Sequence, residues 1–305
     1  MAKLELSGVI PVLPTPFLDD GAIDEASLRR LVRYLIDSGV DGMTFPGVAS
    51  EFAELSLDER VRLTHAVLEE AAGRVPVVVG LTTAGLSQAR ELLAALGPLT
   101  GASALMVADL PQKNAAEQIA FFSELAEASP ALPLMLQNVP APVGAGLAAA
   151  DVLAVVRAVP AVAYVKEETL PSGQRLSQIL AGAPASLQGV LGGAGGRYIT
   201  DELRRGACGT MPAIELTEVH VALMKAHRQG DAAQVRALFT RMLPILNIQA
   251  VFRWSLTKHV LKSRGLIRST RQRAAGPLLD AQDEADVNAF LADLRDLLLP
   301  DSQWR

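Results

Sequence analysis

The chain has 305 residues, half of them hydrophobic, which is enough to bury one large core. Its formal net charge is −5, and it contains no long run of one sign. This balance excludes the basic surface of a nucleic-acid-binding protein and the basic patch of a protein that binds anionic membranes. Cys208 is the only cysteine, which excludes an intrachain disulfide and a thiolate-rich metal site. The expected partner is a small molecule.

The amino-terminal sequence Met1–Leu6 lacks the apolar core of a secretory signal. No later segment approaches the roughly 18 uninterrupted apolar residues of a membrane span. We therefore expect a cytoplasmic protein.

Short apolar runs alternate with amphipathic stretches over the first two thirds of the chain. This alternation is typical of a parallel sheet whose strands are connected by outer helices. Eight strands are predicted, at Val9–Leu13, Gly42–Phe45, Val77–Gly80, Ala104–Val107, Leu134–Gln137, Val162–Lys166, Ser186–Gly189 and Gly209–Met211.

Helical spacing is clearest between the first two strands, where apolar residues recur from Leu28 to Ile36. Ser38-Gly39 should end this helix, because glycine tolerates positive φ. Ser56 and Glu59 have the spacing of a capping box and should begin the next helix. Further helices are predicted at Ser87–Leu96, Ala115–Ala128, Ala149–Val159, Gln174–Leu180, Ile199–Arg205 and Glu218–Arg228.

Strand-like runs disappear beyond residue 230, where Ala232–Leu246, Phe252–Ser263 and Asp283–Leu298 are predicted to be helices. We therefore predict a (β/α)₈ TIM barrel over residues 1–230, with a C-terminal helical extension over residues 231–305 packed on it as one structural domain. The alternative is a doubly wound open sheet. Eight repeats without a dinucleotide-binding glycine motif after the first strand favour the barrel.

Lys166 ends the sixth predicted strand, and barrels carry their active sites at the carboxyl ends of their strands. Alternation along the strand places Tyr164, Lys166 and Glu168 on one face, and Val165 and Glu167 on the other. Apolar surroundings favour the neutral amine of a lysine, which can attack a carbonyl carbon. The alternative is a solvated lysine that pairs with Glu167 or Glu168.

A loop at Gly47–Glu51 leaves the second predicted strand. Its backbone amides and the Ser50 hydroxyl are fixed donors that can hold a carboxylate. The alternative is an ordinary turn between a strand and a helix, with glycine supplying the bend.

The glycine cluster Gly192–Gly196 follows the seventh predicted strand, where many barrels bind phosphate through backbone amides. No lysine with phosphate-loop spacing accompanies it. A flexible loop that lets substrate hydroxyls or a carboxylate approach the backbone is therefore favoured, and a phosphorylated substrate stays open.

Several segments in fixed order resemble the dihydrodipicolinate synthase and N-acetylneuraminate lyase family, whose members are Schiff-base aldolase barrels. They are Gly8–Phe17, Gly47–Glu51 with Leu55–Arg60, Gln137–Pro140 and Val165–Glu167. The resemblance implies that Lys166 forms the Schiff base and that the loop containing Gly47, Ala49 and Ser50 binds the carboxylate of a 2-oxo acid. It also implies that Glu51 orders this loop and that Met211 lines the pocket beside the lysine.

The sequence departs from the synthase pattern at the positions that bind the second substrate. Val48 and Ala49 stand where the family has paired threonines, and Gln137 replaces the tyrosine that donates and accepts protons. The usual tyrosine after strand four falls within Asp109–Pro111, and the usual arginine falls at Pro142. These departures resemble the branch that contains 2-oxo-3-deoxy sugar acid dehydratases.

The expected activity is a lyase reaction without a cofactor or metal, in which Lys166 condenses with the C2 carbonyl of a small 2-oxo acid. Gln137 would orient a substrate group, and the acid–base group would be Glu168 or, less directly, Asp109. A solvated loop carboxylate is the alternative for each. Dehydration of a 2-oxo-3-deoxy sugar acid is preferred over its carbon–carbon cleavage by an aldolase. Dihydrodipicolinate synthesis and a non-catalytic oxo-acid-binding barrel are the competing functions. The resemblance implies a homotetramer built from two dimers.

Overall fold

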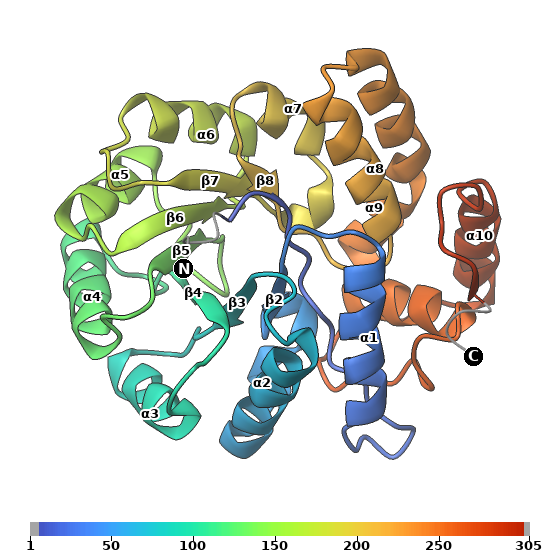
Figure 1. Cartoon of the computed structure of the whole chain (residues 1–305), viewed down its shortest axis with the longest axis horizontal. Helices are drawn as coiled ribbons and strands as arrows, with labels where there is room; N and C mark the ends of the chain where they lie inside the picture. The colour runs from blue at the N-terminus through green and yellow to red at the C-terminus, as the bar shows by residue number, and fades with distance from the viewer. Residues whose placement is uncertain (1–5, 302–305) are drawn as a thin grey trace.

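Eight parallel strands form one sheet in the order β1-β8-β7-β6-β5-β4-β3-β2, and a parallel bridge between Val12 and Thr44 connects its two edges. The helices surround this sheet, so the (β/α)₈ barrel is confirmed (Figure 1). The computed structural model describes residues 6–301. The strands are β1 (Gly8–Val9), β2 (Met43–Phe45), β3 (Val77–Gly80), β4 (Ala102–Ala108), β5 (Leu134–Asn138), β6 (Val162–Glu167), β7 (Gly189–Gly192) and β8 (Gly209–Thr210).

The strands are apolar on both faces, because a parallel sheet in a barrel is covered on both sides. Inward side chains form one cluster in the barrel interior, which includes Ile10, Val78, Met106, Met135, Tyr164 and Leu191. Outward side chains pack beneath the helices in a second, larger cluster. Lys166 follows Tyr164 by two residues, so it continues the inward-facing row of β6.

Outer helices follow each strand, and two of their predicted boundaries are confirmed in atomic detail. Asp24 caps α1, which ends before Gly39 at a φ of 79°. Ser56 and Glu59 form the predicted capping box of α2. The helices are α1 (Glu25–Asp37), α2 (Leu57–Ala71), α3 (Leu86–Leu96), α4 (Ala115–Ala128), α5 (Ala149–Ala158), α6 (Ser172–Ala181), α7 (Ile199–Arg204) and α8 (Thr217–Arg228).

Two predicted strands were wrong in their bounds. The first was predicted at Val9–Leu13 but β1 is shorter, because the prolines at positions 11 and 14 have no amide hydrogen to donate to a neighbouring strand. The seventh was predicted at Ser186–Gly189, yet β7 begins at the last of these residues. Leu187 instead donates its backbone amide to Pro184 O in a turn, at 3.0 Å. This shift moves Gly192 from the predicted loop into the strand.

The extension consists of α9 (Ala232–Ser263) and α10 (Ala281–Ala292). Two helices were predicted within α9, at Ala232–Leu246 and Phe252–Ser263, and α9 consists of two helical parts that meet at a kink at Arg253 (φ 37°, ψ −106°). The helix predicted at Asp283–Leu298 was too long, because after α10 the chain forms successive turns.

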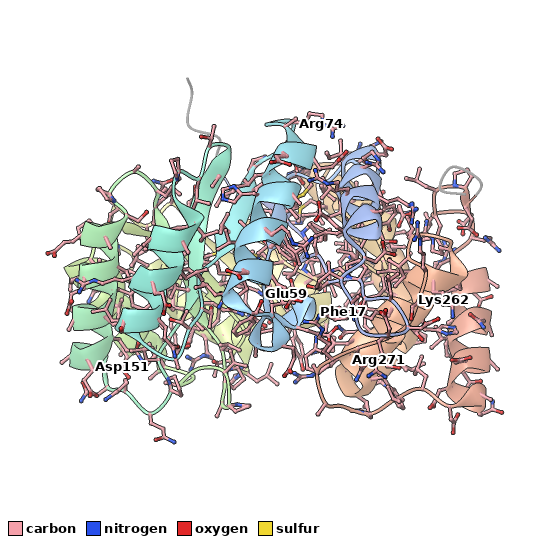
Figure 2. The ribbon with its side chains drawn as sticks, turned by 90° about the horizontal axis from the view of Figure 1, so that it is seen from below. Phe17, Glu59, Arg74, Asp151, Lys262 and Arg271 are labelled. Atoms are coloured by element: carbon pink, nitrogen blue, oxygen red, sulfur yellow. The ribbon has the colours of Figure 1, made fainter. Side chains whose placement is uncertain are left out.

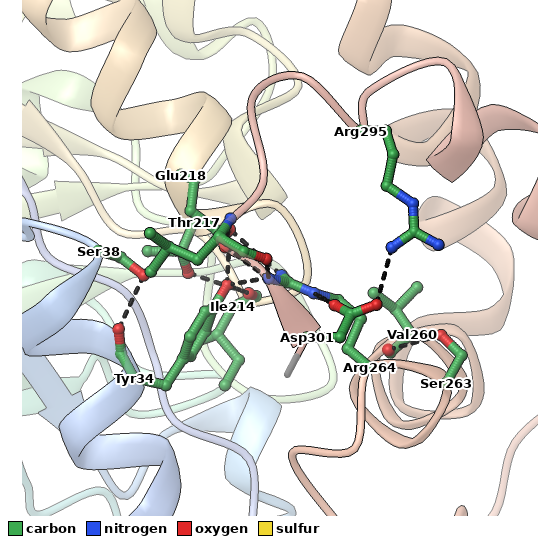
Figure 3. A network of polar contacts seen from close by, with 11 residues as sticks. Tyr34, Ser38, Ile214, Thr217, Glu218, Val260, Ser263, Arg264, Arg295 and Asp301 are labelled. Carbon is green, nitrogen blue, oxygen red and sulfur yellow. Dashed lines mark hydrogen bonds and ion pairs between the residues drawn. The ribbon is translucent and has the colours of Figure 1, made fainter. Parts of the chain in front are cut away.

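A buried polar network joins the extension to the barrel (Figure 3). Arg264, which follows α9, donates to Glu218 Oε1 on α8 at 2.7 Å and to Tyr34 OH on α1 at 3.1 Å. Tyr34 OH donates in turn to Glu218 Oε2 at 2.7 Å. Burial raises the pKa of Tyr34, and the Glu218 carboxylate raises it further, so the phenol remains a donor. The extension is thereby fixed against α1 and α8.

Among the described helices, α9 alone is long and apolar enough to cross a membrane by length and composition. This is weak evidence for a membrane span, because long core helices meet the same criterion. In the structure α9 packs against α8 and α10.

Candidate active site

A cavity of about 280 Å³ opens at the carboxyl ends of the strands. Figure 2 shows the two ends of the barrel: Asp151, in the first turn of α5, lies at the end where strands lead into helices, and Arg74, beyond α2, lies at the other. The cavity volume lies just below the range of about 300–1,000 Å³ typical of small-molecule sites. Its lining includes Lys166, Glu168, Val48, Ala49 and Met211.

Lys166 and Glu168 form a partly enclosed ion pair in this cavity. Lys166 Nζ lies 2.8 Å from Glu168 Oε1, and the two side chains are 5% and 15% exposed. Gln137, which neighbours Lys166 on β5, donates from Nε2 to the same Glu168 oxygen at 2.8 Å. Glu168 therefore contacts both other residues that were predicted to be catalytic.

Two opposing effects set the charge of Glu168. Burial favours the protonated form of this carboxyl, but the positive charge of Lys166 and the hydrogen bonds from Lys166, Gln137 and the Ala194 amide favour the carboxylate. The second group of effects is larger in sum, so the pKa of Glu168 lies below its usual range. Glu168 is therefore held as a carboxylate beside the amine.

Glu167 and Asp109 point away from the cavity. Glu167 accepts hydrogen bonds from Asn138 and Arg175 on the outer side of the sheet. Asp109, the second acid–base candidate, accepts from the backbone amides of Val139, Ala145 and Gly146 at 2.8–3.2 Å. Burial raises the pKa of Asp109, and these amides lower it in part. Asp109 holds the loop after β5 in place and does not line the cavity.

The loop after β2 contributes Val48 and Ala49 to the cavity wall. Val48–Ser50 form one turn of 3₁₀ helix, and the Val48 and Ala49 amides have no acceptor among the described residues. The Ser50 hydroxyl is already used, since it accepts from Gly47 N at 2.8 Å and donates to Leu13 O. Ser50 and Gly47 thus shape the loop, and the free donors belong to Val48 and Ala49.

Glu51 fixes this loop to the C-terminal extension. Its Oε1 is paired with Lys258 Nζ on α9, and both side chains are fully buried. Its Oε2 accepts from the backbone amides of Arg273 and Ala274 at 2.7 Å each. Glu51 itself has a φ of 55°, so the chain turns sharply at this residue. The ordering role implied for Glu51 agrees with these contacts.

Removing one member of this buried pair should be costly. Glu51→Gln would leave the Lys258 ammonium without a counter-charge, so we expect the free energy of unfolding to fall by about 3–5 kcal/mol. Urea denaturation would measure the loss. The double variant Glu51→Gln/Lys258→Met, which removes the stranded charge, should recover part of it. A single variant within about 0.5 kcal/mol of the native protein would contradict this account.

Gly192 and Met211 have different positions relative to the cavity. Met211 lines the cavity as expected. Gly192 ends β7 and faces the helix layer, because a Cβ atom there would lie 1.8 Å from Glu202 Oε2 on α7. The structure therefore gives Gly192 a packing role. Gly192, predicted to bind substrate, is not among the residues that line the cavity, and from the glycine cluster Ala194 and Gly195 line it.

The extension supplies a part of the cavity wall that the sequence did not predict. Gln249, Arg253, Trp254 and Thr257 all lie on α9, and Arg197 follows the glycine cluster. Trp254 Nε1 donates to Val48 O at 2.9 Å, so the kinked part of α9 contacts the amide loop. No motif marked these residues, because their contribution depends on where α9 packs.

The sequence model of the dihydrodipicolinate synthetase family matches residues 5–293. The chain belongs to this family. It is 30% identical over 299 residues to L-2-keto-3-deoxyarabonate dehydratase of Azospirillum brasilense, covering 96% of both chains. It is 32% identical over 245 residues to 4-hydroxy-tetrahydrodipicolinate synthase of Acidobacterium capsulatum, covering 80% of both.

Solved structures of family members have the same fold. Dihydrodipicolinate synthase of Rhodopseudomonas palustris superimposes with a TM-score of 0.87 at 27% identity, over 95% of this chain and 98% of that one. A prophage protein of the dihydrodipicolinic acid synthase family from E. coli K12, in complex with pyruvate, gives 0.86 at 25% identity, over 96% and 99%. The protein is therefore a lyase of the class I aldolase type, and its relatives use small keto acids.

Proposed function

We propose that this protein is a dehydratase of 2-oxo-3-deoxy sugar acids, with a substrate similar to 2-keto-3-deoxyarabonate. The main support is the buried Lys166–Glu168 pair at the end of β6, which combines an amine nucleophile and a proton acceptor 2.8 Å apart. The dehydratase relative, which aligns over 96% of the chain, supports the reaction type.

The first step would be formation of the Schiff base. The substrate carboxylate would accept hydrogen bonds from the free Val48 and Ala49 amides, which places the C2 carbonyl carbon near Lys166. Glu168 would take one proton from the Lys166 ammonium, and the neutral amine would add to C2. The added nitrogen would pass a second proton to the former carbonyl oxygen, and Glu168 would return its proton to the same oxygen. The oxygen leaves as water, and a protonated imine with one hydrogen on nitrogen remains, so charge and protons balance.

The second step would be elimination of water from the imine. The positive imine nitrogen acidifies the C3 protons, so Glu168 can remove one of them and form an enamine. The protonated Glu168 would then donate to the C4 hydroxyl, which leaves as water while electrons return to the imine. Gln137 cannot exchange protons near neutral pH, and its amide would hold Glu168 in the position that both transfers require. Hydrolysis of the imine would release the product and regenerate Lys166.

Borohydride trapping with pyruvate tests the mechanism directly. Borohydride reduces an imine to a stable secondary amine, and intact-mass and peptide analysis would locate it. We expect one pyruvate-derived adduct, confined to Lys166, and turnover of 2-oxo-3-deoxy sugar acids. No adduct on the native protein would reject the Schiff-base mechanism and favour a barrel that only binds oxo acids.

A synthase reaction is the second candidate, because the Acidobacterium relative bears that name at 32% identity. Such an enzyme would consume pyruvate together with aspartate semialdehyde. Pro142 occupies the position where the resemblance led us to expect the arginine that binds this aldehyde, so we expect no condensation product. Coupled assays with both substrates would separate the two activities.

We also propose that the chain assembles as a homotetramer, which the family resemblance implies. Light scattering should then give four times the chain mass. A monomer at micromolar concentration would contradict this assembly.

A further inference from the structure

Two arginines line the same cavity as Lys166 and have no role in the steps above. Arg197 follows the glycine cluster after β7, and Arg253 lies at the kink of α9. Arg197 Nη1 donates to Gln249 Oε1 at 2.6 Å, which fixes the direction of its guanidinium group. Arg253 is solvent-exposed at the cavity wall.

Neither arginine of this pair forms an ion pair with a carboxylate of the described residues. Within the described part of the chain, neither guanidinium has a carboxylate oxygen within 4.0 Å. Burial lowers the pKa of Arg197, and the positive charge of Arg253 lowers it further. The charges of Glu215 and Glu168 raise the pKa of Arg197 in part. Glu215, however, accepts a hydrogen bond from Thr257, and burial raises its own pKa. Like charges held together in this way favour a bound anion.

The backbone conformation of Arg253 is a second observation that points to a functional role for this residue. A φ of 37° with a ψ of −106° is rare for a residue with a side chain and costs conformational energy. The next residue, Trp254, is held by its hydrogen bond to Val48 O, so the kink is fixed against the amide loop. Non-glycine residues in such conformations are found most often at functional sites.

We propose that Arg197 and Arg253 form a second anion site, which binds a carboxylate or phosphate at the far end of a 2-oxo acid held at Lys166. The Val48 and Ala49 amides would take the carboxylate next to the carbonyl, which leaves the arginines for another negative group. This inference rests on the proposed function for the first carboxylate. It extends the proposed substrate class to 2-oxo-3-deoxy sugar acids that carry a second carboxylate or a phosphate where 2-keto-3-deoxyarabonate has a neutral terminal hydroxyl.

Matched pairs of 2-oxo acids test the proposal by competition with pyruvate trapping. One pair is 2-oxopentanoate and 2-oxoglutarate, and another is 2-oxohexanoate and 2-oxoadipate. Each pair differs mainly in the terminal group, so the ratio of inhibition constants reports the second site. We expect the dianion to bind at least about tenfold more tightly, as for one charge-assisted contact. A third pair, 2-oxo-3-deoxygluconate and its 6-phosphate, tests whether the second site binds a phosphate.

Variants of the two arginines test whether the preference for the dianionic acid depends on Arg197 and Arg253. Arg197→Gln and Arg253→Gln should each reduce the ratio to within about threefold of unity while pyruvate trapping at Lys166 continues. Arg204→Gln is the matched control, because its side chain is 76% exposed on α7 and lies outside the cavity. It should keep the native ratio.

Equal binding within every pair, including the phosphate pair, would overturn the second anion site and leave the proposed function intact. A preference that survives both arginine variants would also overturn it. Failure of pyruvate trapping would reject the proposed function instead. Calorimetric titration with the same acid pairs would then still decide the anion site: a preference that depends on Arg197 and Arg253 supports it, and equal affinities reject it.

Discussion

Lys166→Ala should abolish borohydride trapping and lower kcat/KM for a 2-oxo-3-deoxy acid by roughly 10³-fold or more, because the covalent intermediate can no longer form. Lys166→Arg is the sharper variant. Its guanidinium stays protonated and keeps a positive charge beside Glu168, but it cannot form an imine. Both losses should therefore occur in a folded protein, which circular dichroism would verify.

A matched control tests whether the losses are specific to Lys166 or follow from the removal of any lysine. Lys262 is exposed near the end of α9, outside the cavity, so Lys262→Ala should keep native trapping and turnover. A pyruvate adduct in either Lys166 variant would show that another amine is the nucleophile.

Glu168→Gln should lower kcat on the order of 10²–10⁴-fold, because the amide keeps the shape of the side chain but cannot carry protons. The imine with pyruvate should still accumulate at Lys166 under long incubation, since Lys166 retains its amine. Turnover and trapping would thus separate in this variant, whereas they are lost together in Lys166→Ala. The exposed Glu127 on α4 provides the control, and Glu127→Gln should be unchanged in both measurements.

The pH profile gives an independent reading of Glu168. Because its pKa is lowered, the carboxylate form persists as the pH falls below the ordinary value of 4.5 and is lost only through the lower folded value. The acid limb of kcat/KM that depends on Glu168 should therefore lie below pH 4.5. An acid limb near pH 6 that disappears in Glu168→Gln would show that its pKa is raised in the free enzyme.

The reactive end of the site could be predicted because it depends on local rules. The period of two along β6 places Lys166 and Glu168 on one face, and the barrel places the end of that strand at the active face. The capping pair Ser56 and Glu59 is likewise a local pattern, and the structure reproduces it.

Two predictions failed because the residue types did not determine the local backbone structure or the hydrogen-bond partners. The sequence of β7 is rich in glycine, which has little strand preference, so the strand was placed too early and Gly192 received a binding role. Ser50 had the right position but not the predicted contact, because its hydroxyl is used by Gly47 and Leu13. The sequence shows that Ser50 carries a hydroxyl group, but it does not show which atoms this hydroxyl contacts.

The sequence by itself determined the barrel, which follows from periodicity, and the lysine candidate and the loop after β2, whose roles follow from the resemblance of short motifs to the family. Only the tertiary structure decided what surrounds them. Arg253 lies almost ninety positions after Lys166. It lines the same cavity only because α9 breaks its helical angles at that residue and packs against the loop of Val48. Such a contact depends on packing between distant segments, and no local propensity encodes it.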